Sequence, residues 1–285
     1  MISSLSIDGT QIHNTFVAGS GGYFLTQVKG FWGSPVPRQD TFPKARRHGI
    51  INRTAYYDAR ILELDGVVAG VSAADFAAKM DALSALFALG TAHTCYFTRL
   101  GAQPEQCTVT VSTEVSVLNS TPVLVQQWGV TLLADDPRMY SQTLNSLIYD
   151  PTTNASSGMV VPFVFPTAWG GSGINDLSIS NAGQFTTPPI FTVTGPAVNP
   201  IIDNDTTGQH IYTTGLTMVQ GDILVIDVGQ RLVTLNGNNR PDLIDQSQTY
   251  WFELGAGLTL IRMRAASGMV TGQTSLQVQW RNARI

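Results

Sequence analysis

Three features of the sequence predict a mainly β protein of two domains. The 285 residues are about twice the usual length of one domain. Short segments in which apolar and polar residues alternate run through both halves, separated by turn residues. Apolar residues at helical spacing occur in one window. We therefore expect an N-terminal β-sandwich-like domain with a hairpin and one α-helix over residues 1–145. A C-terminal β-sandwich or jelly roll is expected over residues 146–285.

A β-hairpin is predicted early in the first domain. Residues 60–64 and 67–71 are rich in Val, Ile and Leu, and they flank Asp65-Gly66. Asp-Gly is a frequent pair in two-residue turns because such turns need positive φ angles, which glycine adopts without strain. The pattern therefore indicates two antiparallel strands that meet at Asp65-Gly66.

One helix is predicted directly after this hairpin, over about residues 73–89. Ser72 is a suitable N-cap, and Gly90 suits the left-handed position that follows a helix. The apolar residues at helical spacing are Phe76, Met80, Leu83 and Phe87. Packing against a sheet explains this stripe, so we expect it to be part of the core.

Two longer strands are expected to complete the first domain. Residues Thr108–Val117 alternate strictly between apolar and polar side chains, as in a strand buried on one face. Residues Val123–Ala134 are expected to pair with it in an antiparallel arrangement.

The second half shows no helical spacing and contains many short apolar segments, which favours an all-β domain. Asn236-Gly237 marks one of its turns. The expected strands are Val160–Phe165, Ile190–Thr194, Ile223–Asp227, Arg231–Leu235, Leu258–Arg264 and Ser275–Arg281.

Composition and charge exclude several classes of protein. With 16 basic and 20 acidic residues, the chain lacks the excess of Lys and Arg that nucleic-acid binding needs. Charged residues make up 13% of the chain, against about 25% in an ordinary domain. The start of the sequence does not resemble a secretory signal, and no segment is expected to span a membrane. Cys95 and Cys107 are expected to be reduced thiols.

No pattern of catalytic or metal-binding residues is convincing, so we expect neither an enzyme nor a cofactor or metal. His93, Cys95 and Cys107 lack a fourth zinc ligand. Residues 203–208 imitate the start of a calcium loop, but Thr214 stands where a bidentate Glu is required, which indicates a surface turn. Asp135-Asp136 are adjacent rather than facing each other across a cleft, which disfavours a cell-wall glycosidase.

Several motifs, in the same order along the chain, resemble the distal tail proteins of long-tailed bacteriophages. The loop Thr41–Ile50 ends its basic stretch in His-Gly, and Asp136-Pro137-Arg138-Met139-Tyr140 is similar to the corner at the end of that family's first domain. Gly221–Asp227 with the later Asn236-Gly237 resembles its carboxy-terminal domain. The resemblance covers roughly residues 40–285.

The resemblance implies a structural role without catalysis. Proteins of this family form a hexameric ring at the tail tip, with a galectin-like outer domain, and DNA passes through the lumen. The implied partners are further copies of the chain, the tail tube protein, the tail-tip hub or tail-associated protein, and receptor-binding proteins. The resemblance also implies that the protein is synthesised in the host cytoplasm and is then part of the tail tip of the virion. Arg46, Arg47 and His48 are the candidate contacts to a neighbouring subunit or to the tube.

A carbohydrate-binding protein for host-surface glycans is the alternative. Aromatic side chains stack on the apolar face of sugars. The candidate stacking residues in the second half are Trp169, Tyr250 and Trp251, with Trp280 as a further tryptophan of this kind.

Overall fold

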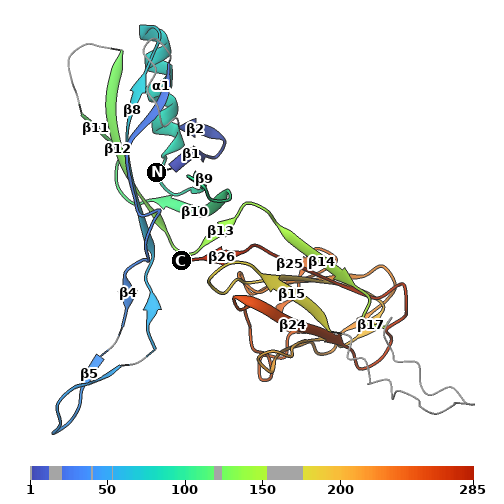
Figure 1. Cartoon of the computed structure of the whole chain (residues 1–285). Coiled ribbons are helices and arrows are strands. Elements are labelled where there is room, and N and C mark those ends of the chain that lie inside the picture. Colours follow the sequence, from blue (N-terminus) through green and yellow to red (C-terminus); the bar gives the residue numbers. More distant parts are fainter. Residues whose placement is uncertain (1, 13–20, 40, 53, 119–123, 153–175) are drawn as a thin grey trace, which may run out of the picture. The chain divides into compact units, whose positions relative to one another are not determined.

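The computed structural model describes residues 2–12, 21–39, 41–52, 54–118, 124–152 and 176–285 (Figure 1). The chain divides into two compact units, residues 1–142 together with Ile285, and residues 143–284. Strands dominate both units, as the sequence predicted. Within the described residues, no helix is long and apolar enough to cross a membrane.

The first unit is built on one antiparallel sheet. Its strand order is β2-β1-β9-β10-β12-β8-β3, and β2 and β3 at the two ends contact each other, so the sheet curls around its core. The short strand β11 pairs with β12, and β13 pairs with β10. The bounds are β1 Ile2–Ile7, β2 Thr10–Ile12, β3 Gly22–Lys29, β8 Arg60–Ala69, β9 Ala92–Arg99, β10 Glu105–Val111, β11 Ser116–Leu118, β12 Val125–Ala134 and β13 Met139–Ser141.

The helix α1 spans Ala73–Leu86 and begins at the N-cap Ser72, whose side chain accepts a hydrogen bond from the backbone N–H of Asp75. It ends at Leu86, with Phe87 as the C-cap, earlier than the expected residue 89. Leu83 and Phe87 are buried in the core of this unit, and Phe76 and Met80 pack against that core.

The hairpin predicted at Asp65-Gly66 is wrong, because residues 60–69 form the single strand β8. Every residue of β8 pairs with β12, so Asp65-Gly66 makes no turn. Gly66 is required here for space. A Cβ at this position would lie 2.6 Å from two ring carbons of Trp128 and 2.5 Å from the carbonyl oxygen of Phe24.

The strand predicted over Thr108–Val117 is also wrong in extent. Strand β10 ends at Val111, and β11 begins only at Ser116. Strand β12 pairs with β10 at two positions and with β11 at three, and along its whole length with β8. Its main partner is thus β8, whereas the sequence pattern had indicated residues 108–117.

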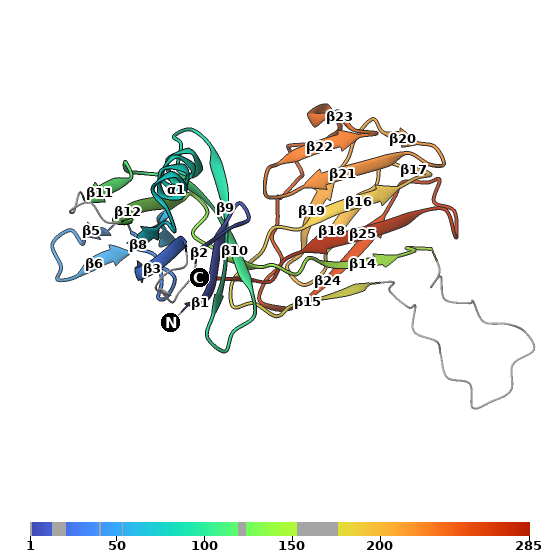
Figure 2. The ribbon, with the colours of Figure 1, turned by 90° about the horizontal axis from the view of Figure 1, so that it is seen from above.

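The second unit contains a sheet of six strands, in the order β14-β25-β16-β21-β22-β23, and a sheet of four, in the order β15-β24-β18-β19 (Figure 2). Buried residues of both sheets form one core, as in a β-sandwich. The short strands β17 and β20 pair with each other. The bounds are β14 Asn145–Tyr149, β15 Leu177–Asn181, β16 Ile190–Thr194, β17 Ala197–Val198, β18 Ile201–Asn204, β19 Gln209–Tyr212, β20 Thr217–Met218, β21 Ile223–Asp227, β22 Leu232–Leu235, β23 Asn238–Asn239, β24 Gly257–Arg264, β25 Ser275–Trp280 and β26 Ala283–Arg284, with a 3-10 helix over Pro241–Leu243.

The strand predictions for the second half agree closely with this sandwich. Strands β16 and β21 have the predicted bounds, and β22, β24 and β25 differ from them by one residue at one end. The predicted strand Val160–Phe165 lies outside the described residues. A galectin-like fold is consistent with the observed two-sheet arrangement.

Candidate assembly interface

A long arm, defined here as residues 36–58, leaves the sheet of the first unit before β8 (Figure 1). Two short antiparallel pairs hold it as a ribbon: β4 Pro37–Arg38 with β7 Tyr56–Tyr57, and β5 Thr41–Pro43 with β6 Ile50–Asn52. The backbone N–H of Asp58 donates to the carbonyl oxygen of Val36 at 2.9 Å and closes its base.

The arm has no core of its own, because every arm residue whose burial the structure describes is exposed. Large apolar side chains are among these residues, with Val36 69% and Tyr56 63% exposed. The others are Phe42, Ile50, Ile51 and Tyr57. A two-stranded ribbon is marginally stable in water, and a run of exposed apolar groups is typical of a protein interface. The arm therefore has the properties of a segment that is covered by a partner.

The tip of the arm is basic. Residues 44–49 connect β5 to β6, and the backbone N–H of Lys44 donates to the carbonyl oxygen of Gly49 at 3.1 Å. Arg46 has a φ of 55°, and Gly49 a φ of 98°. Together with Arg47 and His48, these residues place three full positive charges and one histidine on an exposed loop. No carboxylate of the described residues forms an ion pair with Lys44, Arg46 or Arg47.

Arg60 fixes the base of the arm to the sheet. Its guanidinium donates to the carbonyl oxygens of Gly30 at 2.7 Å, Gly33 at 3.0 Å and Pro137 at 2.9 Å. The arginine itself is buried. Phe31, between the two glycines, is also buried and packs edge-on against Phe97, with ring centroids 4.8 Å apart. The segment of residues 30–33, which leads into the arm, is thus held against the sheet by hydrogen bonds and aromatic packing.

A groove of about 310 Å³ lies on the outer face of the same sheet. Three carboxylates line it, those of Glu63, Asp65 and Glu114. The remaining lining residues are Thr113, Ser116, Gly129, Val130 and Thr131. Glu63 and Asp65 alternate with the buried Leu62 and Leu64 along β8, so they point away from the core.

The absence of a side chain at Gly129 leaves space in this groove. A Cβ on Gly129 would lie 2.7 Å from Oδ1 of Asp65 and 3.1 Å from Oγ of Ser116. One cation reduces the charge, since Nζ of Lys29 lies 2.6 Å from Oε2 of Glu63. With three carboxylates and one ammonium, the groove retains net negative charge.

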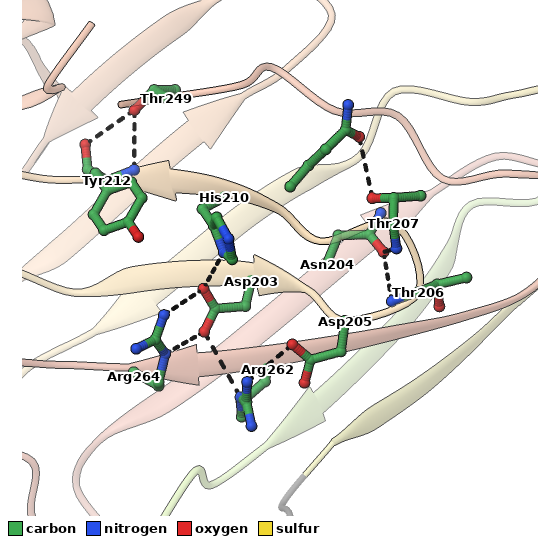
Figure 3. Close-up of polar contacts among 11 residues, drawn as sticks. Asp203, Asn204, Asp205, Thr206, Thr207, His210, Tyr212, Thr249, Arg262 and Arg264 are labelled. Atoms are coloured by element: carbon green, nitrogen blue, oxygen red, sulfur yellow. Dashed lines mark hydrogen bonds and ion pairs between the residues drawn. The ribbon is translucent and has the colours of Figure 1, made fainter. Parts of the chain in front are cut away.

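A second polar cluster covers the four-stranded sheet of the other unit (Figure 3). Asp203 on β18 is fully buried beneath neighbouring side chains. Arg264 binds both of its carboxylate oxygens, with Nη2 at 2.8 Å from Oδ1. Nδ1 of His210 lies 2.7 Å from Oδ1 of Asp203. Nη2 of Arg262 donates to Asp205 at 2.9 Å.

This cluster corrects the prediction that residues 203–208 are a surface turn. Asp203 and Asn204 are buried in β18, and the turn begins only at Asp205. Burial alone would raise the pKa of Asp203, but hydrogen bonds from Arg264 and His210 outweigh it and hold the pKa below its usual value. Burial next to Asp205 raises the pKa of Asp176. The cluster therefore holds the buried Asp203 in its charged form between Arg264 and His210.

His93, Cys95 and Cys107, which were judged unsuitable as zinc ligands from the sequence, have other partners in the structure. Cys95 and Cys107 are directly opposite each other on β9 and β10, and both are buried free thiols. The neighbouring Cys107 and burial raise the pKa of Cys95. His93 instead faces Asp8, with Nδ1 2.6 Å from Oδ2. The described residues contain no group of three side chains suited to a metal ion.

The candidate sugar-stacking residues differ in their surroundings. Tyr250 is 63% exposed, whereas Trp251 packs against the core. Trp280 is buried within that core, so the suggestion that it stacks on a sugar is wrong. Trp169 lies outside the described residues.

Sequence reasoning missed Arg60, the acidic groove and the cluster around Asp203. The sequence does contain a signal for Arg60. Along the strand it is two residues before Leu62 and four before Leu64, both buried, so the alternation places this charged residue on the inner face. The groove offers no comparable signal, because Glu63 and Glu114 meet only through the pairing of strands far apart in sequence.

Comparison with known proteins supports the resemblance found in the sequence. Residues 182–282 match the family described as siphovirus-type tail component, C-terminal domain. The SPP1 Dit (gp 19.1) protein, described as a paradigm of the hub adsorption apparatus in phages that infect Gram-positive bacteria, shares the fold with a TM-score of 0.65. That alignment has 13% identity and covers 97% of each chain.

Two structures of the phage p2 baseplate in its activated conformation, one with Ca and one with Sr, have TM-scores of 0.54 and 0.53. Identity is 11% and 12%, and each alignment covers 97% of both chains. No curated protein matches the chain at a significant level. The predicted resemblance to distal tail proteins is thus confirmed by the family match and by the shared fold.

Proposed function

We propose that this chain, whose residues 182–282 form a siphovirus-type tail component domain, is a structural protein of a phage tail tip. Six copies form a ring that joins the tail tube to the tail-tip hub, and DNA passes through its lumen. The observation that carries the proposal is the arm, a two-stranded ribbon that exposes large apolar side chains.

In the proposed ring, the arm of each copy contacts the body of the next copy, so the contacts are head to tail. Such contacts close into a ring when the rotation between neighbours is fixed. The clamp at Arg60 supplies a fixed direction for the arm at its base. This combination of an exposed arm and a held base supports ring formation.

The charge of the chain fits a ring through which DNA moves. Each copy carries a formal net charge of −4, so a ring of identical copies repels the DNA phosphates overall. Tight DNA binding depends on phosphate neutralisation by Lys and Arg, which an acidic ring supplies poorly. We assign DNA a role only in transit, and we assign the protein no catalytic role.

The names of the matched proteins support the partners proposed here. The descriptions of these matches name a tail component, a hub adsorption apparatus and a baseplate. By this analogy, the neighbours are the tail tube protein, the tail-associated hub protein and receptor-binding proteins, and the mature location is the tail tip of the virion.

Mass photometry and negative-stain electron microscopy of the purified full chain test this function. Closed rings of six copies are expected, alone or after mixing with the tube and hub proteins of the same phage. A strict monomer at all concentrations, with no association with either partner, contradicts the proposal.

Glycan binding by the second unit is the second candidate function. The observation in its favour is the exposed ring of Tyr250, since an exposed aromatic side chain can stack on a sugar. This function is compatible with the ring and adds adsorption to the host surface.

A further inference from the structure

We infer that the basic arm tip of one copy docks into the acidic groove of the next copy in the ring. This inference rests on the proposed function and names the two surfaces that meet. The arm tip is the loop with Lys44, Arg46 and Arg47, and the groove is the one lined by Glu63, Asp65 and Glu114.

The two surfaces have complementary charge. The tip carries three cations, whereas the groove is lined by three carboxylates, of which Glu63 is paired with the ammonium of Lys29. All three basic side chains are exposed, and no described carboxylate forms an ion pair with Lys44, Arg46 or Arg47. Complementary potentials steer association and select the correct partner surface. The arm tip is therefore a suitable occupant for the groove.

A contact within one copy is excluded by the geometry of the ribbon. The tip is separated from Asp58 by about eleven residues, and extended strands rise about 3.3 Å per residue, so the tip can lie up to about 35 Å from the base. The paired strands β4–β7 and β5–β6 hold the ribbon extended. Figure 1 shows the arm pointing away from the end of the unit that carries α1. An arm tip that enters the groove must then come from a second copy.

Apolar contacts accompany the charges at both surfaces. Ile61 is 53% exposed and lies on the same outer face of β8 as Glu63 and Asp65. Ile50 and Ile51 are exposed directly after the basic loop of the arm. Burial of these side chains adds a contribution that does not depend on salt. The contact thus combines an apolar strip with a charged anchor.

A charge-swap experiment tests the pairing. The tip variant carries Arg46→Glu and Arg47→Glu, and the groove variant carries Asp65→Lys and Glu114→Lys. Each variant alone brings like charges together in every contact, so we expect assembly to need at least about tenfold more protein than the wild type. Mass photometry at low ionic strength measures the assembled fraction.

The mixture of the two variants gives the decisive result. A tip variant presents an acidic tip to the basic groove of a groove variant on one side, and its own acidic groove accepts the unchanged basic tip of the groove variant on its other side. Equimolar mixing is therefore expected to restore rings in which the two variants alternate. A native mass spectrum identifies the equal composition.

Two controls separate folding and general charge effects from docking. Asp81→Lys with Asp135→Lys makes the same change of charge as the groove variant, at exposed positions of the first unit outside the groove. This control is expected to assemble like the wild type. Circular dichroism and thermal unfolding verify that each variant is folded.

The outcomes distinguish this inference from the proposed function. If the wild type forms rings and both variants form them equally well, the docking inference is overturned and the ring remains. If both variants fail and their mixture also fails, the pairing of tip and groove is overturned. A wild type that stays monomeric with its partners contradicts the ring and, with it, this inference.

Discussion

The guanidinium of Arg60 donates to the carbonyl oxygen of Gly30 at 2.7 Å and so joins the first residue of β8 to the segment that enters the arm. Gly30 has a φ of 87°, and a Cβ there would lie 2.0 Å from the carbonyl oxygen of Ile61. The close approach of the two chain segments therefore depends on both residues. Both residues hold the segment that leads from β3 toward the arm against the start of β8.

Replacing Arg60 by Met should destabilise the first unit and loosen the arm. The substitution keeps much of the apolar stem but removes the donors to Gly30, Gly33 and Pro137. Loss of donors from partly buried carbonyl groups is expected to lower the free energy of unfolding by about 2 kcal/mol or more. Urea unfolding measures this change. Arg60→Lys, which can supply only part of the donor set, should give an intermediate value, and an unchanged midpoint for Arg60→Met would contradict the clamp.

Replacing Gly66 by Ala should destabilise the first unit through overpacking. The new Cβ would lie 2.6 Å from the Trp128 ring and 2.5 Å from the carbonyl oxygen of Phe24. Such crowding costs about 1–3 kcal/mol, seen as a lower urea midpoint. Gly255→Ala, in the second unit, is the control for an uncrowded glycine, because its Cβ would have no neighbour within 4 Å, and it should keep the wild-type midpoint. A wild-type midpoint for Gly66→Ala as well would show that Gly66 is not required for space.

The fate of Asp65-Gly66 shows which part of the fold the sequence can predict. The prediction of a turn at Asp65-Gly66 depended on the positive φ that glycine tolerates. In the structure, glycine is required at residue 66 because the ring of Trp128, on a strand far away in sequence, occupies the space that a side chain would need. By contrast, Ile190–Thr194 was predicted with its observed bounds because one-sided burial leaves a local alternation.

The candidate sites divide in the same way. Exposure and charge of Arg46 and Arg47 follow from a local basic cluster, so the sequence could point to them. The groove needs Glu63 and Glu114 brought together by the strand arrangement, and burial of Asp203 needs Arg264 on a distant strand. Neither of these two contacts can be predicted from the residues next to it in the sequence.

Glycan binding, if the second unit has it, should depend on Tyr250. Tyr250→Ala removes the exposed ring and is expected to abolish any signal on a glycan array, because stacking on the sugar face is lost. Tyr250→Phe keeps the ring and should retain binding, which separates stacking from a role of the hydroxyl group. A wild-type array without signal, or binding that persists in Tyr250→Ala, would contradict the assignment.

Acid should destabilise the second unit through Asp203. Hydrogen bonds from Arg264 and His210 hold the pKa of Asp203 below its usual value despite burial. An aspartate in the unfolded chain has a pKa of about 3.9. Because the folded pKa is the lower one, its contribution to stability is fully present above about pH 4. That contribution is lost as the pH falls from there through the folded value.

Urea unfolding of the wild type between neutral pH and pH 2 should therefore show a decrease below about pH 4, to which Asp203 contributes. Asp203→Asn removes the buried carboxylate that Arg264 binds, and because the Arg264 side chain is 47% exposed and can be hydrated, we expect a loss of about 1–3 kcal/mol at neutral pH. The variant should also show a shallower decrease in acid. Asp81→Asn removes the same charge from an exposed position and should follow the wild type. If Asp203→Asn kept the full acid dependence, the buried carboxylate would not be one of its sources.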